Sequence, residues 1–364
     1  MEPDYRFVLE MFDGRGVRVG QAPLEVDWEP ALECARFVAV RKGELPVEMA
    51  RPESSLEPIW HRTLGKPFMS GFRVSFHTRK APPVAREFTT RYFRRQALEA
   101  SSGLPEADPD GEQRRGYLVT AYARSHPRAG TRRGKIRLRQ TGPFLPFRKG
   151  DLRALEERSS ALHGTAGKSF PANRLPEGAD DPPVFLPERV LREVTCLGRA
   201  AGARETGGVL IGYLHHDPCL PEIFARVTAQ VPAQGARAEV DRLTFTADTW
   251  TAVRRAMDRR GKEEILLGWW HTHPVSKWCE ACPLDRRRRC PLAVDFFSGH
   301  DRLLHRTIFP QAYGVALVVN GIAAGHETYS VFGWREGLLE PRDCFVLDSS
   351  EGEPRHPRAP LTEE

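Results

Sequence analysis

Residues 264–274, which read EILLGWWHTHP, constrain the fold of this chain more than any other segment. The apolar run has the length of a buried β-strand, and Pro274 cannot continue the strand's hydrogen-bond ladder. Side chains at positions i and i+2 of a strand point to the same face, so His271 and His273 direct two imidazoles toward one point. Such convergence is what a zinc ion requires. Two surface histidines are the alternative, which fits poorly with the apolar run before them.

Ser298 and Asp301 stand three residues apart in SGHDRLLHR, where we expect a helix to begin. This spacing places both side chains on one face of the first turn. Ser298 can cap the helix, and the positive end of the helix dipole favours an ionised Asp301. An ionised carboxylate can be a third zinc ligand, although these two residues taken alone favour an ordinary capping pair.

Glu205 stands at the start of TGGVLIGYL (206–214), a segment that predicts a buried strand. A carboxylate at the end of a strand says little by itself. Glu205 becomes informative only in combination with the two histidines, the serine and the aspartate described above.

Three segments together resemble the signature of the JAB/MPN (JAMM) metallopeptidases, which is a Glu on an early strand, then His-x-His-Pro, then Ser-x-x-Asp. They are ETGGVLIG (205–212), GWWHTHP (268–274) and SGHD (298–301). The resemblance covers roughly residues 187–340. It implies an α/β fold in which a mixed sheet, similar in architecture to that of cytidine deaminases, is flanked by helices.

The resemblance also implies roles for the five residues. His271, His273 and Asp301 would bind zinc, Glu205 would be the general acid/base, and Ser298 would support the tetrahedral intermediate. The implied activity is that of a peptidase or isopeptidase acting after the C-terminus of a ubiquitin-like protein, or on its conjugate. A bacterial ubiquitin-like conjugation or sulfur-carrier pathway, with E1-like or E2-like enzymes as further partners, fits this activity.

The sequence departs from the family's pattern in residues 275–297, which form a long insertion between the His-Pro and the Ser-x-x-Asp. Cys279, Cys282 and Cys290 lie within it and resemble part of a structural zinc knuckle. Three incidental thiols in a loop are the alternative. A fourth ligand is not obvious, and the sequence does not rank its candidates, which are Cys219, His215, His216, His300 and His305.

The composition of the chain indicates several segments. We expect an N-terminal α+β domain (1–170) of unknown function, suited to partner recognition, and a Pro-rich and acidic linker (171–186). The JAB/MPN-like domain (187–346) and a polar, disordered tail (347–364) follow. In the first domain the patterns predict strands at 5–11, 72–77, 116–122 and 136–140, and helices at 28–41 and 150–162.

Helices and strands interleave in the second domain, which predicts a sheet covered by helices. The expected helices are 188–203, 247–260 and one beginning at Ser298. The expected strands are 206–214, 222–231, 264–271, 313–320 and 328–334.

The net charge of +6 on 364 residues permits an acidic partner but does not demand nucleic acid, even with Arg runs such as 286–289. No apolar stretch approaches the ~18 residues of a membrane span, and no signal peptide is visible, so we expect a cytoplasmic protein without membrane partners.

Two alternatives to a peptidase remain. Non-catalytic MPN scaffolds usually lack the ligands or the Glu, all of which this chain has. Repair-associated relatives tend toward His-Asn-His-Pro-Ser-Gly, which differs from the HTHPVS of residues 271–276.

Overall fold

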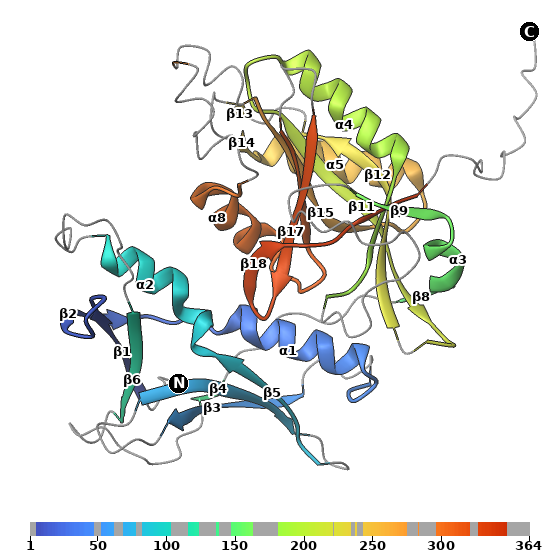
Figure 1. The fold of residues 1–364 in the computed structure, drawn as a ribbon. Coiled ribbons are helices and arrows are strands. Elements are labelled where there is room, and N and C mark those ends of the chain that lie inside the picture. The colour runs from blue at the N-terminus through green and yellow to red at the C-terminus, as the bar shows by residue number, and fades with distance from the viewer. Residues whose placement is uncertain are drawn as a thin grey trace, which may run out of the picture. The chain divides into compact units, whose positions relative to one another are not determined.

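The structure is a computed structural model, shown in Figure 1. It describes residues 5–46, 52–61, 68–77, 82–102, 116–123, 136–137, 147–162, 181–220, 222–233, 237–238, 243–274, 283, 296–320 and 327–347. The chain divides into two compact units. The first comprises Met1–Phe144 and Trp334–Leu338, and the second comprises Leu145–Gly333 and Leu339–Glu364.

The first unit is built on an antiparallel sheet with the strand order β2-β1-β6-β4-β3-β7, in which β5 also pairs with β4. Its elements are β1 (Tyr5–Phe12), β2 (Arg18–Leu24), α1 (Glu29–Arg41), β3 (Glu53–His61), β4 (Phe68–His77), β5 (Val84–Thr89), η1 (Thr90–Phe93), α2 (Arg94–Ser101), β6 (Gly116–Ala123) and β7 (Ile136–Arg137). The predicted strands 5–11, 72–77 and 116–122 and the helix 28–41 are thereby confirmed. Of the predicted strand 136–140, only the first two residues are described.

Aromatic side chains form the centre of this unit's core. The rings of Trp28, Phe72, Tyr92 and Phe93 contact one another, and the Tyr92 hydroxyl donates a hydrogen bond to the carbonyl of Asp27 at 2.5 Å. Burial of large aromatic side chains is a major source of stability. The first unit therefore has a hydrophobic core of its own.

The second unit contains a mixed sheet with the strand order β18-β17-β16-β15-β11-β12-β10-β19-β9, and β8 pairs with β11. Its strands are β8 (Arg148–Lys149), β9 (Ser159–Ala161), β10 (Val184–Pro187), β11 (Gly207–Asp217), β12 (Glu222–Pro232), β15 (Ile265–His273), β16 (Val315–Asn320), β17 (Thr328–Arg335), β18 (Leu338–Pro341) and β19 (Phe345–Leu347), with a separate pair β13 (Arg237–Ala238) and β14 (Leu243–Thr244). Its helices are α3 (Leu152–Glu156), α4 (Glu188–Ala201), α5 (Ala247–Arg260) and α8 (Gly299–Ile308). The expected mixed α/β class is confirmed, and every element predicted between 188 and 334 is present.

Helices cover both faces of the second sheet. The Thr195 hydroxyl of α4 lies 2.8 Å from the hydroxyl of Tyr329 on β17. Val319 of β16 pairs with Tyr329 of β17 on one side and with Thr272 of β15 on the other, so these three side chains point to the same face of the sheet. His271 is next to Thr272 along β15, so its side chain points to the opposite face. Because Asp301 of α8 contacts His271, α4 and α8 lie on opposite faces. Among the described helices, none is long and apolar enough to cross a membrane.

The structure differs from the sequence prediction at residues 150–162. Only Leu152–Glu156 are helical, and Ser159–Ala161 then form β9, which pairs with β19. Leu152 packs in a cluster with Phe185, Phe224 and Leu347, so this segment belongs to the second unit. The division between the units accordingly falls at 144/145, earlier than the expected residue 170.

The expected linker also differs from the structure. Residues 184–186 belong to β10, which lies between β12 and β19 in the sheet. The apolar side chains of Val184, Phe185 and Leu186 are buried, which explains why the segment forms a strand despite its Pro-rich surroundings. Residues 171–180 lie outside the described part of the chain. At the other end, Leu347 still belongs to β19, and residues 348–364 are not described.

Candidate metal centre

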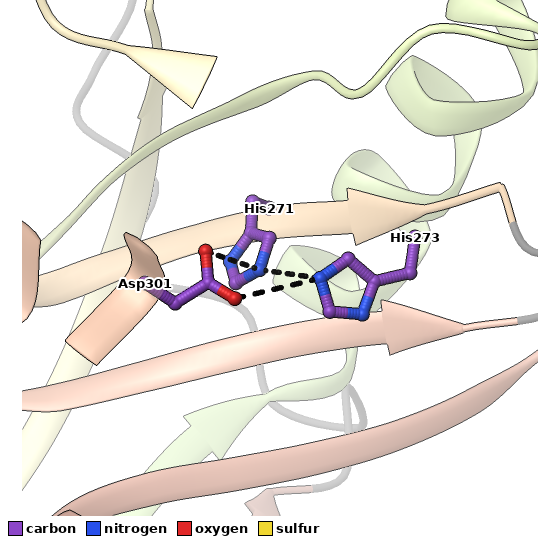
Figure 2. A group of neighbouring side chains, drawn as sticks. All are labelled: His271, His273 and Asp301. Carbon is purple, nitrogen blue, oxygen red and sulfur yellow. Dashed lines mark hydrogen bonds and ion pairs between the residues drawn. The ribbon is translucent and has the colours of Figure 1, made fainter. Parts of the chain in front are cut away.

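His271 and His273 lie at the end of β15 with their side chains on one face, as their spacing predicts (Figure 2). Both residues are buried, with 0% and 1% of their surface exposed. Their Nε2 atoms are 3.0 Å apart. The two imidazole nitrogens therefore meet at one point inside the molecule rather than at its surface.

Asp301 reaches the histidines from the first turn of α8. Ser298 is the N-cap of that helix: its hydroxyl oxygen accepts a hydrogen bond from the Asp301 amide at 3.0 Å, and the Ser298 amide donates to Oδ2 of Asp301 at 2.8 Å. Asp301 Oδ1 lies 3.4 Å from His271 Nε2, and Oδ2 lies 3.7 Å from His273 Nε2. Asp301 therefore takes part in the helix cap and also faces the two histidines. Its hydrogen bonds with Ser298 fix the direction of the carboxylate.

The three side chains fit a metal ion. Their candidate ligand atoms all lie within 4.8 Å of one another. A tetrahedral ion with bonds of ~2.1 Å has ligands about 3.4 Å apart, and the separations of 3.0, 3.4 and 3.7 Å bracket that value. Within the described residues, His271, His273 and Asp301 are the group of His, Cys, Asp and Glu side chains that meets this geometry. Three donors leave a tetrahedral ion one open position.

Charge at the centre also favours a cation. Burial raises the pKa of Asp301, but His271 and the hydrogen bonds from His271, His273 and Ser298 outweigh it and hold that pKa well below its usual range. Burial lowers the pKa of His271, yet the Asp301 carboxylate outweighs it and leaves the pKa raised. Burial lowers the pKa of His273, and the charge of His271 lowers it further. Without a metal, protonated His271 is the positive partner of the buried carboxylate, and a bound cation would take the place of that proton.

Glu205 lies beside this triad, two residues before β11 begins at Gly207. Its side chain is buried, and Oε1 lies 3.9 Å from His273 Nε2. The pairing of Gly207 with His271 brings the start of β11 next to the end of β15. The Glu205 carboxylate therefore lies beside the triad without belonging to it.

Asn320 contacts the centre but was not found by sequence reasoning. It lies at the end of β16, directly beside His273 in the parallel pair β15–β16, and its Oδ1 is 3.2 Å from His273 Nδ1. An amide oxygen accepts a hydrogen bond from the Nδ1–H group, which leaves Nε2 as the lone-pair nitrogen that a metal needs. The ring of Phe296 stacks on the ring of His273, with centroids 4.3 Å apart.

The possible second zinc site cannot be compared with the structure. Cys279, Cys282 and Cys290 lie outside the described residues, so their shared site stays a prediction. Of the candidate fourth ligands, His305 is fully buried and its Nδ1 accepts a hydrogen bond from Trp269, while the ring of His215 stacks on Phe224.

Comparisons with known proteins add little to this geometry. No protein-family model matches the chain, and no curated protein matches it. Similar solved structures include the solution structure of protein DSY2949 from Desulfitobacterium hafniense, which is 17% identical, spans 45% of this chain and 93% of that one, and has a TM-score of 0.31. A similarity of that degree carries no argument about function.

Proposed function

We propose that the protein is a zinc-dependent peptidase or isopeptidase of the JAB/MPN (JAMM) type. The observation that carries the proposal is the position of the Glu205 carboxylate, 3.9 Å from the metal-facing nitrogen of His273, next to a three-residue donor set. Two imidazoles and one carboxylate are typical of catalytic zinc sites, which keep one position open. Glu205 is then available for proton transfer.

The chemistry follows from what each residue can do. A bound zinc ion would act as a Lewis acid and bring the pKa of water in its open position to ~7. The Glu205 carboxylate takes the proton that the attacking water gives up and returns it to the nitrogen of the leaving amine. Ser298 Oγ accepts from the Asp301 amide, so its own O–H remains able to donate to the oxyanion of the tetrahedral intermediate.

We further propose that the scissile bond follows the C-terminus of a ubiquitin-like protein, because the five site residues occur in the order of the JAMM signature and with its spacing inside each motif. The N-terminal unit has its own sheet and core, which suits a separate role in recognising the substrate or an E1-like or E2-like partner. A cytoplasmic location is part of this proposal.

The decisive experiment compares the wild type with Glu205→Gln on linear fusions and isopeptide-linked conjugates of ubiquitin-like proteins. We expect the purified wild type to hold one equivalent of zinc at this centre and to cleave. Glu205→Gln should keep that zinc and lose cleavage by about 100-fold or more, the scale of general acid–base catalysis. Glu263→Gln is the matched control, because the Glu263 side chain is 92% exposed. Equal behaviour of wild type and Glu205→Gln on every conjugate would favour the non-catalytic scaffold.

A further inference from the structure

His305 is a buried, ionisable residue to which the proposed mechanism gives no task. It lies on α8 and has 0% of its surface exposed. Its Nδ1 accepts a hydrogen bond from the indole N–H of Trp269 on β15 at 3.1 Å. An indole nitrogen can only donate, so Nδ1 must be without a proton. Burial and the charge of Arg342 lower the pKa of His305 to about 3, despite the opposing Gly314 carbonyl, so the imidazole is neutral at physiological pH.

Trp269 connects this hydrogen bond to the metal centre. Its ring stacks on the ring of His271, with centroids 4.4 Å apart and planes inclined by 11°. Phe297, which is 5% exposed, has its ring within 6.2 Å of the rings of Trp269, His271 and His305. Water is thereby kept from the Trp269–His305 hydrogen bond, and the bond is stronger there than at a surface.

The spacing of the four residues makes two parallel links between α8 and β15. Asp301 and His305 are four residues apart on a helix, a rise of about 6 Å. His271 and Trp269 are two residues apart on a strand, a rise of about 7 Å. Asp301 contacts His271 and His305 contacts Trp269, so the helix and strand run in opposite directions with matching steps. The contact between Trp269 and His305 therefore fixes the position along β15 at which Asp301 contacts His271.

We propose that the hydrogen bond from Trp269 to His305 is a positioning contact that holds Asp301 of α8 against the two histidines of β15. The triad draws two ligands from the strand and one from the helix, so the helix position decides whether the donor set closes. Metal–ligand distances in a well-formed site lie within ~0.2 Å of their usual values. A helix that is loosely held against the strand would displace its ligand by more than that. His305 is a positioning residue for the metal, and the inference rests on the metal-binding part of the proposed function.

The test measures metal affinity rather than cleavage. The apo protein is titrated with Co²⁺, followed by its visible absorption, and then with zinc in competition with a chelator. Trp269→Phe keeps the ring stacked on His271 but removes the donor, and His305→Leu removes the acceptor. We expect each to weaken binding of both metals by about 10- to 100-fold, the usual effect of groups that orient metal ligands. The double variant should bind no more weakly than either single variant.

Three controls separate positioning from general destabilisation. His305→Asn retains an acceptor near Nδ1 and should bind within a few-fold of wild type. Leu303→Ala, at a side chain that is 59% exposed on the same helix, should bind like wild type. In an Asp301→Ala background, His305→Leu should cause no further loss, because the group it positions is gone. Thermal unfolding of the metal-free variants reports the purely structural contribution.

The outcomes are distinguishable. Wild-type affinity in Trp269→Phe and His305→Leu, even with lower unfolding temperatures, would overturn the inference and leave the proposed function standing. The inference would also be overturned if His305→Leu lowered the metal affinity equally in the wild-type and in the Asp301→Ala background. A wild type that binds neither metal would overturn both the inference and the proposed function. Metal binding that follows the expected pattern without cleavage of any conjugate would overturn only the peptidase.

Discussion

At the residue scale, the contact between His273 Nδ1 and Asn320 Oδ1 determines which ring nitrogen of His273 can bind a metal. An acceptor at Nδ1 holds the proton there and leaves Nε2 free for a metal. We expect Asn320→Leu to weaken zinc binding by about 10- to 100-fold, whereas Asn320→Asp keeps an acceptor and should bind at least as tightly as wild type. Competition with a chelator measures both. Unchanged affinity in a folded Asn320→Leu protein would contradict the role.

The spacing in the sequence accounts for four of the five site residues, whereas Glu205 enters only through the resemblance to the JAMM signature. The period of two in a strand unites His271 and His273, and the three-residue step of a helix start unites Ser298 and Asp301. Asn320 was not predictable, because it meets His273 only through the pairing of β15 with β16, 47 residues along the chain. Long-range pairings of this kind leave no local pattern in a single sequence.

At the scale of elements, Asp217 ties two segments of the second unit together. Its carboxylate accepts hydrogen bonds from the amides of Leu152, Cys219 and Leu220 at 2.8, 2.7 and 3.0 Å. The start of α3 is thereby fastened to the turn between β11 and β12. Burial raises the pKa of Asp217, but the three amides outweigh it and leave the pKa below its ordinary value.

The lowered pKa gives the Asp217 interaction a defined pH dependence. A carboxyl group whose pKa is lower in the folded state stabilises that state above the unfolded pKa of ~3.9, and the contribution falls as the pH drops toward the folded value. We expect Asp217→Asn to lower the free energy of unfolding by about 1–3 kcal/mol at pH 7. The difference should shrink below about pH 4. Urea unfolding at several pH values measures it, and a difference independent of pH would refute the assignment.

Local signals explain which elements were predictable. Helix α5 begins with a capping box of Thr246 and Thr249 and ends at Gly261, which has a φ of +57°, so its bounds agree with the prediction. The prediction of one helix over 150–162 was wrong because apolar residues at helical spacing do not show where a helix ends. Ser159–Ala161 form a strand only because β19, more than 180 residues along the chain, provides the partner.

At the scale of the whole molecule, the boundary between the two units determines which fragment can fold alone. The family resemblance begins near residue 187, but β8, α3, β9 and β10 precede it and belong to the second unit, the three strands as part of its sheet. Strand β10 fills the position between β12 and β19, and Phe185 on it contacts the rings of Phe224 and Phe345. A fragment that starts at 187 leaves two strand edges unpaired and a large apolar contact open.

We therefore expect residues 145–364 to fold and bind one equivalent of zinc, whereas residues 187–364 aggregate or unfold at a much lower temperature. Unpaired strand edges and the loss of the fully buried Phe185 both act in this direction, and removal of a buried Phe side chain alone costs about 3–5 kcal/mol. Size-exclusion chromatography, thermal unfolding and zinc content measured on both fragments check the expectation. A fragment 187–364 that is monomeric and as stable as 145–364 would show that the preceding strands are accessory. A third fragment, 181–364, restores β10 alone, and stability equal to that of 145–364 would identify β10 as the essential part.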